Sequence, residues 1–178
     1  MQLLIDVHMS PQDYTQRFRE VEWPILKACP ICGAHAKLLG HGWYRRNALP
    51  TRETELVVMI HRLLCPACRK TVSLLPSFLL PFFQYTTRFV VKSLLGKAKS
   101  YRELLRFHWR RFLETANGIL AFLRDRGVRD RLPEDRKERA MKLLGSIENS
   151  GLEMFSMLFH KTNQRGFMAN SSYLPKKP

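Results

Sequence analysis

The sequence lacks any long uncharged apolar run. The longest candidate, residues 71–87, is interrupted by Pro76 and Pro81, and no run reaches the roughly 18 apolar residues that a membrane-spanning helix requires. The first residues, MQLLIDVHMS, have no basic region, and Asp6 interrupts their short apolar stretch, so they do not match a secretory signal. These absences predict a soluble cytoplasmic protein, in a compartment that keeps thiols reduced.

Acidic residues are also scarce. The 178 residues contain 15 Asp and Glu against 30 Lys and Arg, a formal net charge of +15. Such a chain is expected to meet a polyanion, either nucleic acid or an anionic membrane surface, although a merely soluble basic protein has the same composition. With 45% hydrophobic residues, the chain can bury a core and does not match a disordered protein.

Cysteine occurs only four times, in two C-x2-C pairs separated by 32 residues: Cys29 with Cys32, and Cys65 with Cys68. A C-x2-C knuckle directs two thiolates at one ion, and two knuckles complete the tetrahedral four-sulfur site that Zn²⁺ accepts. Proline after the first cysteine of each pair stiffens the turn, and Gly33 tolerates a positive φ. The pattern predicts one structural zinc ion.

The segment between the knuckles fits a zinc ribbon. HGWYRRNALP, residues 41–50, supplies turn residues, and ELVVMIHRLLC, residues 55–65, is a β-rich run that leads into the second knuckle. Because so small a sheet has little core of its own, the metal would supply much of its folding energy.

Other interpretations of the cysteines stay open. A redox C-x-x-C is one, although two matched copies at ribbon spacing argue against it. Iron is the stronger rival, since paired C-P-x-C knuckles also resemble those of rubredoxins; rubredoxins are typically acidic, whereas residues 29–80 hold seven cations and two carboxylates. His35, His41 and His61 are further potential ligands, but four cysteines already complete a site.

Two flanking segments carry no evident chemistry. Residues 1–28 are predicted to form a short strand or tail and then a helix capped by Ser10, with Pro11 at its first position. In LLPSFLLPFF, residues 74–83, prolines prevent a regular helix or a central strand. We expect residues 76–84 to form a semi-rigid connector whose Phe and Leu side chains pack the ribbon against the helical region after it; an exposed patch here would instead mark a protein interface.

The region from 85 to 131 is predicted to be helical and basic. Residues 85–99 have helical periodicity, and Ser100 stands three residues before Glu103, the spacing of a capping box. Arg102, Arg106 and Arg110 follow at four-residue intervals, and residues 81–131 hold 12 cations against four acids. This stripe is the best candidate for phosphate contacts, with an ordinary solvated Arg-rich face as the alternative.

Further boundaries are expected nearby. Asn117-Gly118 either divides this segment into two helices or is tolerated inside one. Gly127 can end a helix, Pro133 can begin another, and a last apolar piece follows Gly151. The final residues, 170–178, are expected to fray.

The predicted class is α+β: a helical segment (1–28), a zinc ribbon (29–75), the connector (76–84), a basic helical region (85–131), and C-terminal helices with the tail (132–178).

CPICG, HGWYRR and IHRLLCPACRKTVSLLPSFLLPFFQY together resemble the zinc-ribbon modules of bacterial insertion-sequence and transposase-related proteins, over roughly residues 25–125. The resemblance implies zinc at the four cysteines, a helix-turn-helix after the ribbon, and nucleic-acid contacts at Arg45, Arg46 and Arg62. These transposases cut DNA with three acidic residues on a ribonuclease-H-like domain, and no alternating βαβ region is present here. We therefore do not expect a complete transposase.

The sequence thus predicts a non-catalytic, zinc-dependent protein of a mobile genetic element that binds double-stranded DNA, acting with a separate transposase or recombinase or as a regulator. Alternatives are a truncated transposase or nuclease, a rubredoxin-like iron protein, and a protein-interaction module using residues 74–83. The predicted DNA contacts are cations of the ribbon and of the following helices: Arg45, Arg46, Arg62, Arg69, Lys70, Arg88, Lys92, Arg102, Arg106, Arg110 and Arg111.

Overall fold

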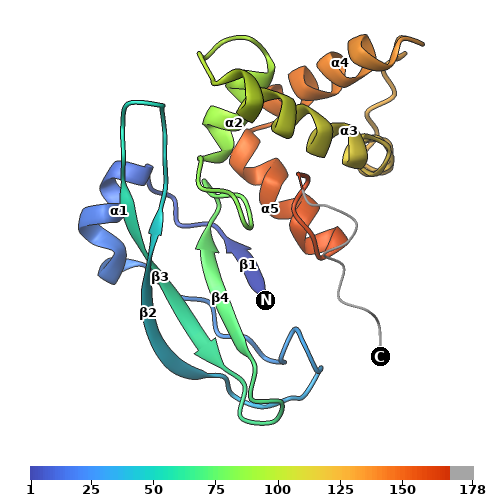
Figure 1. Ribbon diagram of the computed structural model, residues 1–178. Helices are drawn as coiled ribbons and strands as arrows, with labels where there is room; N and C mark the ends of the chain where they lie inside the picture. Colours follow the sequence, from blue (N-terminus) through green and yellow to red (C-terminus); the bar gives the residue numbers. More distant parts are fainter. Residues whose placement is uncertain (169–178) are drawn as a thin grey trace. The chain divides into compact units, whose positions relative to one another are not determined.

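A computed structural model describes residues 1–168, which form two compact units, Met1–Thr86 and the part that begins at Thr87 (Figure 1). The described residues contain a four-stranded mixed sheet in the first unit and four longer helices in the second. The predicted α+β class is confirmed. The tail predicted to fray, residues 170–178, lies outside the described residues. No helix within residues 1–168 is both long and apolar enough to cross a bilayer.

The sheet of the first unit has the order β1-β4-β3-β2. Strand β1 (Gln2–Ile5) runs parallel to β4 (Thr71–Pro76), whereas β3 (Val57–Leu64) is antiparallel both to β4 and to β2 (Leu39–Asn47). Figure 1 shows β3 and β4 joined by the loop that carries residues 65–70. The two long antiparallel pairings therefore bring the second knuckle to one end of the sheet.

The segment 41–50 is mainly strand rather than the turn that the sequence suggested. Strand β2 continues to Asn47, with Trp43 opposite His61 and Tyr44 opposite Ile60, and the turn follows at residues 48–56. The aromatic side chains at 43 and 44 favour an extended backbone. The glycines before them mark a bulge rather than the chain reversal, since the register shifts between Gly40 and Trp43.

A short helix precedes the ribbon. Helix α1 (Pro11–Arg17) begins where predicted: Ser10 is the N-cap, its hydroxyl accepts a hydrogen bond from the Asp13 N–H at 3.1 Å, and Pro11 occupies the first turn. Tyr14 is fully buried, and its hydroxyl donates to the Met59 carbonyl of β3 at 2.7 Å. That contact fixes the helix on the sheet. The 3-10 helix η1 (Phe18–Glu20) follows it.

Residues 76–86 belong to the first unit and contribute to its core. Short turns follow β4, and bridges join Leu79 to Thr86 and Leu49 to Tyr85. Phe78, Leu79, Leu80 and Phe83 are all buried. The proline-rich stretch therefore packs its side chains as the burial preference of large apolar residues requires. The fully buried centre of this unit includes Val58, Ile60, Val72, Leu74, Leu75, Leu79 and Leu80.

The second unit is helical. It consists of α2 (Thr87–Leu94), α3 (Arg102–Asp125), α4 (Arg136–Asn149) and α5 (Leu152–Asn163). Phe122 of α3 lies edge-on to Phe155 and Phe159 of α5, with ring centroids 5.4 and 5.2 Å away. The Thr115 hydroxyl donates to the carbonyl of Phe167. The buried centre also includes Phe112, Ile119, Leu143, Leu144 and Ile147.

Glycines end two of these helices by the same device. Beyond α3, Gly127 has φ 83°, its N–H donates to the Arg124 carbonyl, and the Val128 N–H donates to the Leu123 carbonyl. This is the Schellman motif, and Gly96 ends α2 in the same way. Gly127 therefore ends a helix as predicted.

One detail of the predicted helices is wrong. The capping box does not form: Tyr101 is the N-cap of α3, and no side chain makes a capping hydrogen bond there. Asn117-Gly118 lies inside the 24-residue helix α3, the second of the two predicted alternatives. Burial of Phe112, Ile119 and Phe122 on this helix outweighs the roughly 1 kcal/mol cost of one glycine. Residues 95–101 separate α2 from α3, a longer link than the three- or four-residue turn of a standard helix-turn-helix.

Candidate metal centre and cationic surface

The four cysteines converge on one point. Cys29 and Cys32 lie in the loop before β2, and Cys65 and Cys68 lie between β3 and β4. All four Sγ atoms lie within 4.8 Å of one another. The Cys29–Cys68 and Cys32–Cys65 pairs are each separated by 3.9 Å. The predicted ligand set is thus brought together across a gap of more than 30 residues in the sequence.

These distances fit one tetrahedral ion. Zinc–thiolate bonds of about 2.3 Å place the sulfurs at the corners of a tetrahedron whose edges are about 3.8 Å. The observed 3.9 Å separations agree with that edge, and are much longer than the roughly 2.05 Å of a disulfide. Soft thiolate donors suit zinc and iron alike, so this geometry is compatible with a bound metal ion but does not choose between the two.

The two knuckles have matching backbones. In the first, the Cys29 N–H donates to the Ala34 carbonyl and the Gly33 N–H donates to the Cys29 carbonyl; in the second, Cys65 pairs with Lys70 and Arg69 in the same way. The residue after each second cysteine has a positive φ, 73° at Gly33 and 58° at Arg69. Gly33 adopts this conformation freely, whereas Arg69 does so at a cost in backbone strain.

The protein environment favours a thiolate at Cys29. Burial alone would raise the pKa of this thiol, but hydrogen bonds from the backbone N–H groups of Cys32 and Ile31 and from the Cys65 and Cys32 side chains outweigh it, so that the pKa of Cys29 falls from 9.0 to about 7 while the pKa of the neighbouring Cys32 rises to about 11. The Ile31 N–H lies 3.4 Å from the sulfur. A thiol that ionises near neutral pH is ready to bind a metal ion.

The histidines weighed as further ligands are not in the cluster. His35 and His41 are exposed. His61 stacks on Trp43, with centroids 4.5 Å apart, and burial lowers its pKa. The rings of Trp23 and Phe18 pack edge-on to Trp43. These four rings form an aromatic cluster on the ribbon that the sequence did not predict, because its members are brought together only by strand pairing and by η1.

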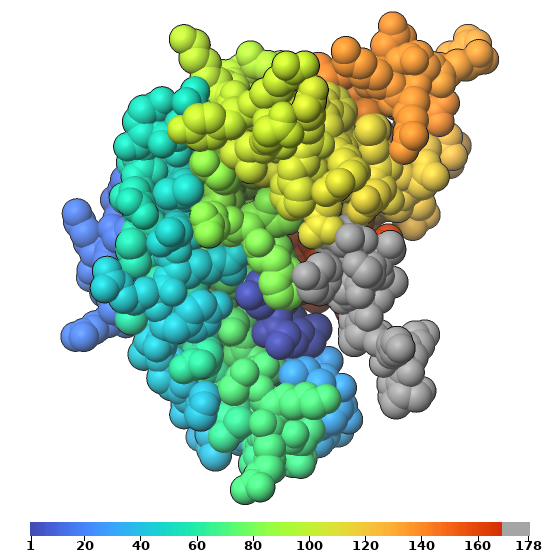
Figure 2. Space-filling model, viewed as in Figure 1, coloured from blue at the N-terminus to red at the C-terminus, as the bar shows by residue number. Residues whose placement is uncertain are grey.

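The predicted ribbon cations fall into two groups. Arg45, Arg69 and Lys70 are exposed, and the segment of the second knuckle forms a surface tip of the first unit (Figure 2). Arg62 is half-buried, with its guanidinium 5.6 Å from the ring centroid of Tyr44. Arg46 differs from all of these: its Nη2 donates to the carbonyls of Leu80 and Phe83 at 2.8 and 2.7 Å, and burial lowers its pKa.

The predicted DNA-contact cations of the helical unit also differ in their exposure and in their ion pairing. Arg102 and Arg110 are exposed, and Arg110 lies 5.8 Å from the ring centroid of Phe107. Arg106 is exposed but forms an ion pair with Glu103 at 2.9 Å. Arg111 is only 9% exposed. The four-residue repeat therefore gives a solvent-facing stripe of Arg102, Arg106 and Arg110. Arg111 is buried, and its guanidinium lies 5.4 Å from the ring centroid of Phe107.

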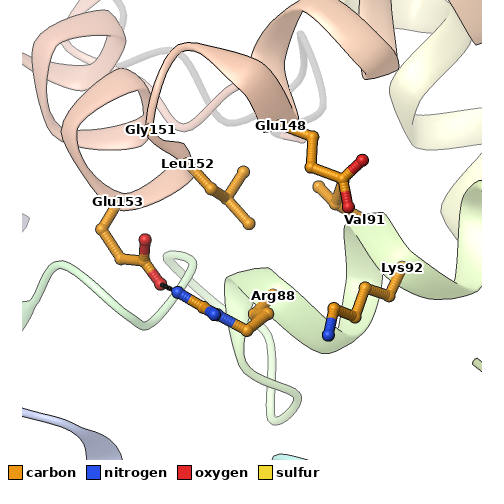
Figure 3. A pocket seen from close by; sticks show the side chains of 7 residues that line it. All are labelled: Arg88, Val91, Lys92, Glu148, Gly151, Leu152 and Glu153. Atoms are coloured by element: carbon orange, nitrogen blue, oxygen red, sulfur yellow. Dashed lines mark hydrogen bonds and ion pairs between the residues drawn. The ribbon is translucent and has the colours of Figure 1, made fainter.

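Arg88 and Lys92 of α2 line a shallow pocket of about 170 Å³. Figure 3 shows Arg88 reaching across it to Glu153 of α5, an ion pair of 3.2 Å. Glu148, Gly151, Val91 and Leu152 complete the lining. The pocket lining contains two cations and two carboxylates, so its net charge is far less positive than that of the stripe formed by Arg102, Arg106 and Arg110.

One family model, described as a domain of unknown function (DUF6431), matches residues 29–105. The match begins at Cys29 and covers both knuckles, α2 and the start of α3. Neither the curated proteins nor the solved structures contain a match to the chain.

Proposed function

We propose that this chain is a zinc-dependent, non-catalytic protein of a bacterial mobile element that binds double-stranded DNA, as an accessory or regulator of a separate transposase. The resemblance of its knuckles and flanking residues to transposase-related zinc ribbons supports the proposal. The metal would fold the ribbon and hold its exposed cations in place, and the basic helices would add further phosphate contacts. In a bacterial cytoplasm such a protein would associate with the nucleoid.

The observation that carries the proposal is the unbalanced positive charge of α3. Arg102 and Arg110 make no ion pair among the described residues, and Glu103 is the carboxylate partner of Arg106. The three arginines lie four residues apart, about one helical turn, and face solvent. A row of cations at this spacing can follow a phosphate backbone and gains free energy by releasing condensed counterions.

Burial narrows the set of proposed contacts. Arg46 donates hydrogen bonds to backbone carbonyls inside the first unit, and Arg111 is buried. Arg88 forms an ion pair with Glu153. Arg106 is likewise paired, with Glu103. The favoured phosphate contacts are therefore the exposed cations that have no ion pair among the described residues: Arg45, Arg69, Lys70, Lys92, Arg102 and Arg110.

A salt titration tests the proposal. The zinc-loaded protein should bind random duplex DNA at low salt, and the logarithm of its affinity should fall linearly with the logarithm of salt concentration. Arg102→Gln and Arg110→Gln should each flatten that slope by about 1. Arg17→Gln is the matched control, since Arg17 is also exposed but is paired with Glu20 in a nearly neutral segment. No binding at low salt, or a salt-independent affinity, contradicts the proposal.

The four-sulfur geometry equally supports a second candidate, a rubredoxin-like iron protein. Metal analysis separates the two. A colourless protein with one zinc ion per chain supports the proposal, and a coloured iron-loaded protein that fails to bind DNA supports the electron carrier. DNA nicking abolished by substitution of an Asp or Glu would instead favour a nuclease.

A further inference from the structure

The second knuckle, a surface tip of the first unit (Figure 2), holds an arginine in a backbone conformation that favours glycine. Arg69 has φ 58°, and Gly33, at the same place in the first knuckle, has φ 73°. Glycine adopts this left-handed conformation freely, whereas a residue with a side chain is strained there. A phosphate contact alone does not account for the strain, because a long cationic side chain reaches phosphates equally well from an unstrained position. Strain of this kind collects at functional sites.

The backbone around Arg69 is held in place. The Arg69 N–H donates to the Cys65 carbonyl at 2.9 Å, and the Cys65 N–H donates to the Lys70 carbonyl at 3.0 Å. The side chains of Cys65 and Cys68 belong to the four-sulfur cluster. Arg69 therefore extends from a fixed turn, and binding a ligand there costs little further ordering of the backbone.

The guanidinium of Arg69 is available to a ligand. The residue is exposed and makes no hydrogen bond or ion pair with any other described residue. Lys70 beside it is also exposed, and the exposed neighbours Pro66 and Ala67 have no polar side-chain atoms. The tip thus offers a ligand two cations and no side-chain oxygen.

Carboxylates are absent from the sequence around this tip. Residues 23–52 and 56–86 contain no Asp or Glu. The two carboxylates between these segments, Glu53 and Glu55, lie in the turn that joins β2 to β3, at the opposite end of these strands from the second knuckle. A polyanion can therefore approach the tip without repulsion from the ribbon.

We propose that Arg69 enters the minor groove of the bound duplex and gives the protein a preference for A·T-rich sites, while Lys70 contacts a flanking phosphate. This inference rests on the proposed DNA-binding function and names the kind of site that is bound. The minor groove is only about 6 Å wide, so its two walls confine a single extended side chain, whereas in the major groove, about 12 Å wide, a lone arginine lies against one wall only. Runs of A·T pairs narrow the minor groove and strengthen the negative potential that attracts arginine.

The experiment measures the affinity of the full-length zinc-loaded chain for duplexes of equal length whose central base pairs are all A·T, all G·C or all inosine·C. Inosine lacks the N2 amino group of guanine, so an inosine·C pair resembles A·T in the minor groove and G·C in the major groove. The wild-type protein should bind the A·T and inosine·C duplexes roughly fivefold or more tighter than the G·C duplex.

Variants assign the preference to one residue. Arg69→Gly and Arg69→Asn should bind the three duplexes with equal affinity and should melt at the same or a higher temperature, since Gly and Asn tolerate a positive φ. Lys70→Gln is the matched control: it removes the neighbouring cation, so it should weaken binding to all three duplexes by a similar factor and keep the preference.

Several outcomes overturn the minor-groove role. If the inosine·C duplex binds like the G·C duplex, the protein reads the major groove. If wild-type protein binds all three duplexes equally, Arg69 reads no groove and the DNA-binding function stands. A preference that survives both Arg69 substitutions belongs to another residue. If both variants lose metal or melt at a lower temperature, the arginine serves the knuckle itself. If no duplex binds at low salt, both proposals fail.

Discussion

Replacing Arg69 with glycine should stabilise the protein while weakening its proposed binding to DNA. Arg69 and Gly33 occupy the same position in the two knuckles, with φ 58° and 73° and the same hydrogen bond back to the first cysteine. One knuckle therefore serves as the reference for the other. The comparison isolates a single difference, a side chain in a conformation where glycine is favoured.

The change in the free energy of unfolding on Arg69→Gly is the difference between two opposing contributions. The left-handed conformation costs an arginine roughly 1–2 kcal/mol, and glycine loses an additional 0.5–1 kcal/mol or so of conformational entropy on folding. Arg69→Gly should therefore raise the free energy of unfolding of the first unit by about 0.75 kcal/mol, the midpoint of a range of about 0–1.5 kcal/mol. For a unit of this size, about 0.75 kcal/mol raises the melting temperature by about 3–6 °C.

The assay is thermal unfolding of the metal-loaded protein at fixed free metal, combined with the salt titration of DNA binding. Gly33→Ala is the reciprocal control: an added Cβ there meets no atom within 4 Å, so a loss of about 1 kcal/mol would come from the backbone alone. DNA affinity of Arg69→Gly should fall, with a salt slope flatter by about 1. Lower stability and weaker metal binding in Arg69→Gly would refute this reasoning, and would show that the guanidinium offsets the negative charge of the four thiolates.

The remaining predictions concern the metal, the buried arginine and a buried histidine. A strong chelator, or Cys65→Ser, should unfold the sheet and change the fluorescence of Trp23 and Trp43 while the helical circular dichroism of α2–α5 persists; an unchanged spectrum would show that the ribbon folds without metal. Arg46→Met should lower the free energy of unfolding by about 2 kcal/mol or more, because two charge-assisted hydrogen bonds are lost, but should leave the salt slope of DNA binding unchanged; a flatter slope at full stability would make Arg46 a phosphate contact. Burial lowers the pKa of His108 from 6.5 to about 4. The unfolded chain therefore binds this proton first, and stability that is present above pH 6.5 should be lost as the pH falls toward 4, by up to about 3 kcal/mol. His108→Gln should flatten this dependence in denaturant titrations, and an unaltered pH profile would assign it to other groups.

The metal site could be predicted from the sequence because its chemistry is local. Each knuckle needs only four consecutive residues to direct two sulfurs at one point, and the intervening length permits a hairpin that joins the knuckles. The cap at Ser10 and the helix end at Gly127 are local in the same sense. Each of them depends on residues within a few positions along the chain, where side-chain type determines which backbone hydrogen bonds can form.

Contacts between residues far apart in the sequence could not be predicted from these local patterns. Parallel pairing of β1 with β4 joins residues about 70 positions apart, and nothing in the residues near Gln2 specifies that partner. The role of Arg46 was hidden for the same reason, since the carbonyls it binds lie 34 and 37 residues away. At Ser100 the local signal for a capping box failed, because α3 begins after Tyr101. At Asn117-Gly118 the local signal allowed either a break or a continuous helix, and the packing of α3 decides for the continuous helix.

The unequal burial of the four cysteines would make one side of a bound metal ion more accessible than the others. Cys65 and Cys29 are 0% and 2% exposed, Cys68 is intermediate and Cys32 is exposed. If a metal ion were held by the four sulfurs, a competing ligand would reach it most readily from the Cys32 side. In that metal-loaded protein, where all four sulfurs would be thiolates, a small thiol-reactive electrophile should modify Cys32 before the other three cysteines.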